Sequence, residues 1–541
     1  MRVRAGIVGN EPGWRLLLNQ EGVPHSSVPE APAAGEFSVL AASGKPSAAG
    51  LEAIRSHLAR GGGVLCSGEV YGRLAEGKTR SSALRCVLGD QGPGVFDPDL
   101  VDLFAQCEIP SNANSLRSDG GPQSAYCGEF GGGHVAVLPF DPPALACDGR
   151  TAVKSFYASR GRLPFERVSL VSKGGVRRLV SKALAWLHLR SGFPYTHLWY
   201  FPGNQTSVFA LRIDTDYARQ PEIERLRELA RRMQVPVTWF VDAGSQRSFL
   251  KLYGAFTEDE VGIHCFDHRG AGEPGARAAD IRRAMEEFAS AGLKAASYAA
   301  PYGTWDERLA SDAEHFNFFY SSEFSYDYDN VPSMPYAGGR FLSTLQVPVH
   351  PISVGGLRRQ GFSEEEMISY FRDVMERKIR LREPVMLYHH PGDGHPAVLE
   401  TMIARAREGG LSPCRMIDYA AWWRRRSCEG WEITHDGSTI TVQQPAQGVA
   451  EGAEPQGWGK PFLRIVGKDG LEAFHPAEAS IDLDTLEWHA PQGAPDLPAD
   501  ILRARKFNPW IPIIRAEDAM ARFFSGGSPR RPDAEGTGEK R

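Results

Sequence analysis

The sequence has few cysteines, no long apolar run and no excess of positive charge, and each shortage argues against a class of protein. Its eight cysteines among 541 residues are scattered and form no C-x-x-C pair, which indicates reduced thiols in a cytoplasmic protein and not a disulfide framework. No apolar run approaches the ~18 residues of a membrane span, and no apolar stretch of a secretory signal follows the first arginines. The net charge of −5 predicts no nucleic-acid partner.

The composition is that of a folded protein with more than one domain. Hydrophobic residues make up 42% of the chain and aromatic residues 10%, which is enough to fill real cores. The length is typical of roughly three to four domains. These values leave the oligomeric state open.

The first 195 residues alternate short apolar strands with amphipathic helices. Strands are expected at 37–43, 63–68 and 132–142, and a helix at 50–63 that ends at glycines. This alternation predicts a doubly wound parallel sheet. The stretch 37–74 resembles the flavodoxin-like fold of class I glutamine amidotransferases, but Cys66 in "GVLCSGEVYG" lacks the glycine spacing of their nucleophile elbow. The resemblance therefore implies a non-catalytic relative, in which Cys66 is a small buried thiol.

Three further regions follow. Residues 196–428 repeat strand and helix units, from the strand "SVFALRID" to the strand "PVMLYHH", and predict a distorted (β/α) barrel. Residues 429–525 consist of short alternating pieces, including a hairpin signal at Asp436-Gly437, and predict a small β domain. Residues 526–541 are expected to form a disordered tail.

Four stretches of the middle region carry polar groups at expected strand ends, where barrel enzymes place their catalytic residues. In "LRIDTDY", side-chain alternation along a strand puts Arg212, Asp214 and Asp216 on one side. The others are "HCFDH" with His264 and His268, "AAPYGTW" with Tyr302, and "VMLYHHPGDGH" with His389. His390, Asp393 and His395, which follow the last strand, are expected in a solvated loop.

In this order the stretches resemble the NodB-type polysaccharide deacetylases, which form carbohydrate esterase family four. The stretch "RIDTD" corresponds to the family motif T-F-D-D-G, and "HCFDH" corresponds to H-[ST]-x-x-H. The stretch "AAPYG" corresponds to R-x-P-[YW]-G, and "LYH" corresponds to L-x-H. The resemblance covers about residues 205–428. It implies an enzyme that removes the acetyl group of an N-acetylated sugar or polysaccharide.

The resemblance also implies a role for each residue. His264 and His268 would bind one divalent metal ion with an aspartate; zinc is the expected ion, with cobalt, manganese, nickel or iron as alternatives. Spacing alone does not decide between Asp214 and Asp216, and the family pattern makes Asp216 the ligand and Asp214 the base. The backbone N–H of Tyr302 would stabilise the oxyanion, and His389 would protonate the leaving amine.

The chain departs from the family pattern at two places, which keeps two alternatives open. Ala299 stands where the family has an arginine that holds the base, and Arg212 is expected to replace that arginine. The family's fourth motif has no match, and "YSSEFSYDYDN" (320–330) occupies its place. The alternatives are a metal-dependent hydrolase of a small non-carbohydrate amide and a degenerate protein that only binds carbohydrate.

Overall fold

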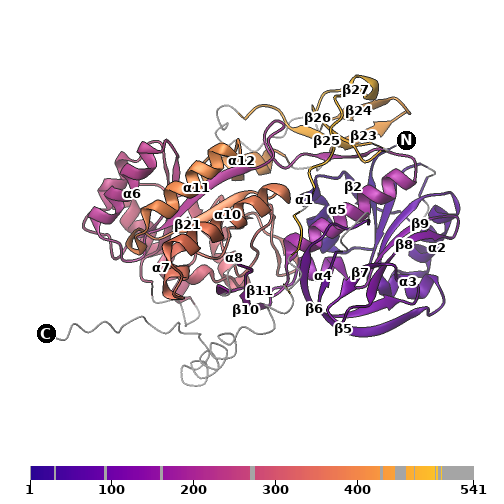
Figure 1. The fold of residues 1–541 in the computed structure, drawn as a ribbon, viewed down its shortest axis with the longest axis horizontal. Coiled ribbons are helices and arrows are strands. Elements are labelled where there is room, and N and C mark those ends of the chain that lie inside the picture. The colour runs from indigo at the N-terminus through magenta and orange to yellow at the C-terminus, as the bar shows by residue number, and fades with distance from the viewer. Residues whose placement is uncertain are drawn as a thin grey trace.

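The chain folds into two α/β lobes and a smaller β unit in the computed structural model (Figure 1). The structure describes residues 2–501 except for 30–31, 34, 90–93, 159–162, 269–274, 427–429, 445–457, 468, 494 and 498–500. The predicted tail at 526–541 lies outside the described residues. No helix among the described residues has the length and apolar character needed to cross a membrane.

The first lobe is built on a nine-stranded mixed sheet with the order β2-β1-β3-β4-β9-β8-β7-β5-β6. The strands β2, β1, β3, β4 and β9 run parallel to one another, and the remaining neighbours pair antiparallel. The strands are β1 (Ala5–Val8), β2 (His25–Ser27), β3 (Val39–Ala42), β4 (Gly63–Ser67), β5 (Thr79–Leu88), β6 (Leu100–Pro110), β7 (Ser115–Ser118), β8 (Gln123–Phe130) and β9 (Gly133–Leu138). The expected strands at 37–43, 63–68 and 132–142 are present, whereas the antiparallel half was not predicted.

Helices cover both faces of this sheet and give the lobe three layers. One core joins the sheet to α1 (Pro12–Glu21), α4 (Pro142–Ala146) and α5 (Lys173–Arg190). The opposite core joins it to α2 (Ala48–Ala59) and α3 (Gly68–Leu74). Cys66 lies within this second core with no exposed surface, and burial raises the pKa of its thiol to about 12. Such a thiol is poorly suited to act as a nucleophile.

The second lobe is built on a curled sheet of parallel strands with the order β20-β17-β16-β15-β14-β13-β21, and β22 pairs with β13. Its strands are β13 (Val208–Asp214), β14 (Val237–Asp242), β15 (Glu260–Cys265), β16 (Ser297–Tyr298), β17 (Tyr320–Ser321), β20 (Leu345–Gln346), β21 (Val385–His389) and β22 (Ser412–Pro413). Its helices are α6 (Gln220–Arg232), α7 (Ala276–Ser290), α8 (Glu307–His315), α9 (Val354–Arg359), α10 (Glu364–Arg380), α11 (Pro396–Glu408) and α12 (Met416–Arg425). The strand–helix repeat predicted for this region is therefore present.

Strand alternation sorts the residues of β13 between two environments, and this sorting positions the site. Leu211 and Ile213 pack into the core between the sheet and its outer helices. Ala210 points to the inner side of the curled sheet, into a separate aromatic core. Arg212 and Asp214 share that inner side by the two-residue period of a strand.

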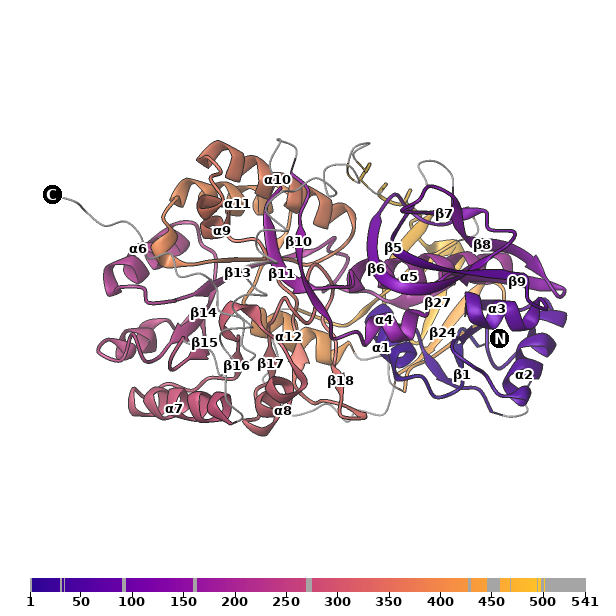
Figure 2. The same cartoon turned by 90° about the horizontal axis from the view of Figure 1, so that it is seen from below.

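A hairpin from the first 195 residues reaches across to the second lobe. Its strands are β10 (Thr151–Ser155) and β11 (Phe165–Ser169), which pair antiparallel and lie in front of the second lobe in Figure 2. The backbone N–H of Phe165 donates to the side chain of Gln360, just after α9, at 3.0 Å, and Gln360 donates back to the Phe165 carbonyl at 3.1 Å. The ring of Phe156 lies edge-on to Tyr328 and His350. The two lobes are thus joined by specific contacts.

The β unit consists of two three-stranded sheets above the first lobe (Figure 1). One pairs β12 (Tyr195–Leu198) with β25 (Phe462–Val466) and β26 (Glu472–Pro476), so the segment between the lobes is a strand of this sheet. The other contains β23 (Glu432–His435), β24 (Thr439–Gln443) and β27 (Ser480–Asp482). The turn predicted at Asp436-Gly437 connects β23 and β24.

Candidate metal centre

Three predicted metal ligands meet at the edge formed by the carboxyl ends of β13 and β15. The Nε2 atom of His264 lies 3.0 Å from Oδ1 of Asp216, and Nε2 of His268 lies 3.1 Å from Oδ2. One ligand atom from each residue falls within 4.8 Å of the other two. Sequence places these side chains up to 52 residues apart, and the parallel sheet brings them together.

The atoms that face one another in this cluster have the properties of ligand atoms. Oδ1 of Asp216 and both Nε2 atoms are buried and have no hydrogen-bond partner among the described residues. Burial alone would raise the pKa of Asp216, but His264 and His390 hold that pKa well below its usual range, so the carboxylate is ionised. A carboxylate and two imidazole nitrogens gathered this closely are donor atoms suited to a bound cation.

The backbone fixes the orientation of the His264 ring. Its Nδ1 atom lies 2.6 Å from the carbonyl oxygen of Ala299, so Nδ1–H donates to that carbonyl. This directs Nε2 toward the cluster, and metal-binding histidines commonly have their other ring nitrogen hydrogen-bonded in this way. Ala299, which lacks the family's arginine side chain, therefore supports the site through its backbone.

Arg212 and Asp214 form a bidentate ion pair below the cluster. Nε and Nη2 of Arg212 donate to the two carboxylate oxygens of Asp214 at 2.6 and 2.7 Å. Nη1 of Arg212 also donates to the carbonyl and hydroxyl oxygens of Ser322, at 2.6 and 3.1 Å. Arg212 therefore takes the place beside Asp214 that was predicted for it. Both oxygens of Asp214 are engaged by Arg212, in contrast to those of Asp216.

We expect Arg212→Met to destabilise the protein strongly. Arg212 and Asp214 are 1% and 3% exposed, and removing one partner of a buried pair leaves an uncompensated charge that costs about 3–5 kcal/mol. Chemical denaturation measures this loss as a lower free energy of unfolding. Arg219→Met is the matched control, because the Arg219–Glu222 pair lies at the surface and its loss should change stability little. Equal effects of the two substitutions would contradict the role given to the buried pair.

The loop that carries Tyr302 is held against the site by the stretch 320–330. The carboxylate of Glu323 accepts the backbone N–H of Ala300 at 3.0 Å, and the carbonyl of Gly303 accepts the N–H of Ser325 at 3.0 Å. Tyr302 adopts a left-handed backbone conformation with φ 59° within η2 (Pro301–Gly303). Its ring centroid lies 4.8 Å from that of His268. The stretch 320–330 thus supports the loop that carries Tyr302.

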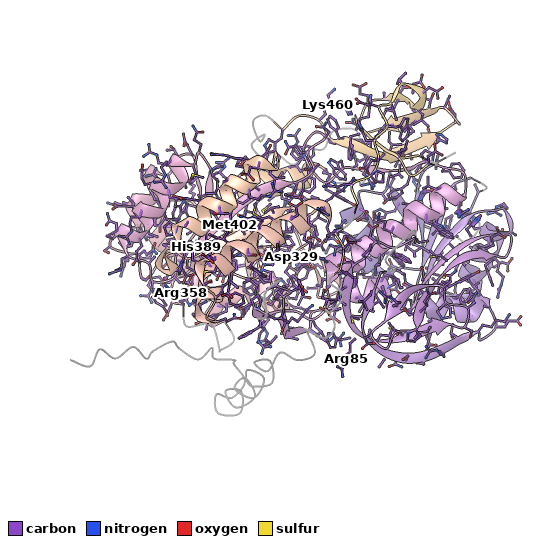
Figure 3. The ribbon with its side chains drawn as sticks, in the orientation of Figure 1. Arg85, Asp329, Arg358, His389, Met402 and Lys460 are labelled. Carbon is purple, nitrogen blue, oxygen red and sulfur yellow. The ribbon has the colours of Figure 1, made fainter. Side chains whose placement is uncertain are left out.

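The two adjacent histidines at the end of β21, His389 and His390, face opposite sides of the sheet. His389 pairs with Ile213 in the sheet register, so it faces the outer helices and not the side of Arg212 and Asp214. It is 2% exposed, its Nδ1 has no partner among the described residues, and burial lowers its pKa to about 3. Figure 3 shows His389 inside the second lobe. This position does not suit the predicted role of His389 as a proton donor to substrate.

His390 takes the position that was expected for His389. Its Nε2 lies 3.6 Å from Oδ2 of Asp216, and its Nδ1 lies 3.0 Å from Oδ2 of Asp393. Burial would lower the pKa of His390, but Asp216 and Asp393 raise it above its usual value and favour the protonated ring. Sequence reasoning expected His390 and Asp393 in a solvated loop, but the structure places their side chains in contact with each other beside the cluster. The strand register could have identified His390. Tyr388 pairs with Arg212, and residue 390 lies two positions further along the chain, so it is on the same side of the sheet as Arg212.

No protein-family model and no curated protein matches the chain. Solved structures similar to part of it include a Mycobacterium smegmatis protein assigned as a polysaccharide deacetylase, with 17% identity and a TM-score of 0.36 over 41% of this chain and 92% of that one. A carbohydrate esterase family 4 pseudoenzyme from Bacillus anthracis has 17% identity and a TM-score of 0.30, over 40% and 66%. An allantoinase has 14% identity and a TM-score of 0.36, over 42% and 92%. At scores this low, the function has to rest on the geometry of the site itself.

Proposed function

We propose that this protein is a metal-dependent hydrolase that removes the acetyl group from an N-acetylated sugar or polysaccharide. The observation that carries the proposal is the convergence of Asp216, His264 and His268, with ligand atoms within 4.8 Å of one another, next to the Asp214–Arg212 ion pair and to His390. One carboxylate and two imidazoles would occupy three positions of a divalent ion and leave others open for water and substrate.

The donor set fits the predicted cofactor, one divalent ion. Asp216, His264 and His268 would hold it, and Asp216 rather than Asp214 is favoured because both oxygens of Asp214 are engaged by Arg212. Zinc is the first candidate for two imidazoles and a carboxylate, and cobalt, manganese, nickel and iron accept the same donors. When bound, such an ion lowers the pKa of a water molecule and polarises a substrate carbonyl.

We assign proton transfer and charge stabilisation to the remaining groups. Asp214, oriented by Arg212, would take a proton from the attacking water. The Tyr302 backbone N–H is assigned by the family resemblance to the oxyanion of the tetrahedral intermediate. His390, held by Asp393 at 3.0 Å, would donate the proton that the leaving amine needs. The acid role thus moves from His389 to His390.

The domain assignments made from sequence also stand as proposals. In the first lobe, the parallel strands follow the order β2-β1-β3-β4-β9, which matches the 2-1-3-4-5 order of flavodoxin-like sheets. This order supports a flavodoxin-like first domain at 1–195, followed by the deacetylase-like domain at 196–428. The two small sheets support a β domain from residue 429 that also recruits β12.

The function is tested by measuring acetate release from N-acetylated glucosamine oligomers with added zinc, cobalt or manganese. The proposal predicts release that depends on the metal and stops with a chelator. Hydrolysis of small amides such as cyclic ureides, without acetate from any sugar, would overturn the substrate assignment in favour of the non-carbohydrate alternative. Binding of sugar with no hydrolysis under any metal would make the protein a degenerate carbohydrate-binding relative.

A further inference from the structure

Two exposed tyrosines stand on either side of the metal ligand His268. Among the described residues, only Phe104, Tyr217 and Tyr302 are large hydrophobic side chains with exposed surfaces, at 36%, 62% and 37%. The ring centroid of Tyr217 lies 5.6 Å from that of His268, and the ring centroid of Tyr302 lies 4.8 Å from it. Large apolar side chains that remain exposed at one place commonly mark a binding site.

The backbone presents both rings in a conformation that bulky residues rarely adopt. Tyr217 has φ 49° and Tyr302 has φ 59°, in the left-handed region. The carboxylate of Asp242 accepts the backbone N–H of Tyr217 at 3.4 Å, and the contacts of Glu323 and Ser325 hold the loop around Tyr302. Costly backbone conformations of this kind persist at functional sites when the surrounding structure holds them.

Both rings lie outside the hydrophobic cores of the second lobe. The core clusters of the second lobe, as far as the structure describes them, contain neither Tyr217 nor Tyr302. The two rings therefore face solvent beside the cluster of Asp216, His264 and His268. A tyrosine combines an apolar face with a hydroxyl group, so it can pack against the C–H face of a sugar ring and also bond its hydroxyls.

We propose that Tyr217 and Tyr302 form an aromatic subsite that binds the pyranose ring bearing the acetamido group. This inference rests on the proposed function and names how that function recognises its substrate. Tyr217 comes directly after Asp216, so its ring is placed by the same strand end that supplies the carboxylate ligand. A sugar ring packed there sits next to His268, and its acetamido group lies at the metal cluster. With such a subsite, we expect the protein to prefer an amide attached to a sugar ring over a linear amide of equal size.

The test compares Tyr217→Ala with Phe104→Ala in the metal-loaded protein. Phe104 is a matched control, because it is an exposed aromatic residue with φ 47° in the first lobe, away from the site. Metal content, KM and kcat for an N-acetylated glucosamine oligomer, and the calorimetric Kd of its deacetylated product are measured. We expect Tyr217→Ala to raise KM and Kd about 10-fold, with metal content kept and kcat changed little. Tyr217→Phe should retain most of the binding, and Phe104→Ala should behave as the unaltered protein.

The outcomes separate this inference from the function on which it rests. If the unaltered protein hydrolyses the oligomer and Tyr217→Ala has the same KM and Kd, the subsite is overturned while the function stands. If Tyr217→Ala loses metal, Tyr217 supports the ligands and the subsite is again overturned. If the unaltered protein neither hydrolyses nor binds the oligomer, the proposed function is overturned, and the subsite with it.

Discussion

Replacing His264 or His268 with alanine is expected to remove the bound metal and lower turnover by ~10³-fold or more. Each variant deletes one of three proposed protein ligands and leaves only one of the two ligand imidazoles, at 3.0 or 3.1 Å from Asp216. A site of two ligands does not hold a divalent ion tightly, and the remaining groups cannot replace its charge. Metal analysis after dialysis and acetate release measure the two effects on the same samples.

His395→Ala is the matched control for these variants. His395 lies after β21, and its Nδ1 pairs with Glu364 outside the cluster, at 2.9 Å. The His395→Ala variant should keep both the metal and the activity. His264 is also bonded to the Ala299 carbonyl, so its loss is expected to lower the melting temperature, whereas His268→Ala makes no such change in the core. Retention of full metal content and turnover by His264→Ala and His268→Ala would show that the metal is bound elsewhere.

The second large effect is expected at His390. His390→Ala should keep the metal and lower turnover by ~10²–10⁴, which is the usual contribution of a general acid. The ring of His390 lies on the side of Asp216 and is held by Asp393, whereas His389 faces the outer helices. Steady-state kinetics with an activated leaving group measures the role directly, because a good leaving group needs no proton and should restore much of the rate.

His389→Leu provides the contrast between these adjacent residues. The His389 ring is buried with Nδ1 unsatisfied, so an apolar side chain of similar size should be tolerated without loss of stability. Turnover should remain within a few-fold of the unaltered protein. A large loss of turnover in His389→Leu together with normal turnover in His390→Ala would show that His389 is the general acid, as the L-x-H pattern predicts.

The longer strands of the second lobe, such as β13 and β21, were predictable because their apolar runs are long, whereas the two-residue strands β16, β17, β20 and β22 carry no such run and were not predicted. The stretch "SVFALRID" contains β13, and "PVMLYHH" contains β21. The candidate ligands were predictable for a related reason, since polar residues directly after buried strands meet at one edge of a parallel sheet. The choice between His389 and His390 needed the register of β21 against β13, which the sequence of one strand does not contain.

The antiparallel half of the first sheet was not predicted, and its sequence explains why. Strand β5, "TRSSALRCVL", has exposed and buried residues in an irregular order, so it shows neither a continuous apolar run nor a regular alternation. The β10–β11 hairpin was missed because its contacts with Gln360 and His350 come from residues about 200 positions away. Tertiary contacts of that range determine such elements, and local patterns do not show them.

The central claim is that Asp216, His264 and His268 bind one divalent metal ion, and anomalous diffraction at the absorption edge of that ion tests it most directly. Crystals of protein purified without chelator, after soaking in zinc, should show one strong anomalous peak. The account predicts the peak at about 2.0–2.2 Å from a carboxylate oxygen of Asp216 and from Nε2 of both histidines. A peak at His390 and Asp393 alone, or no peak within ligand distance of Asp216, would contradict it.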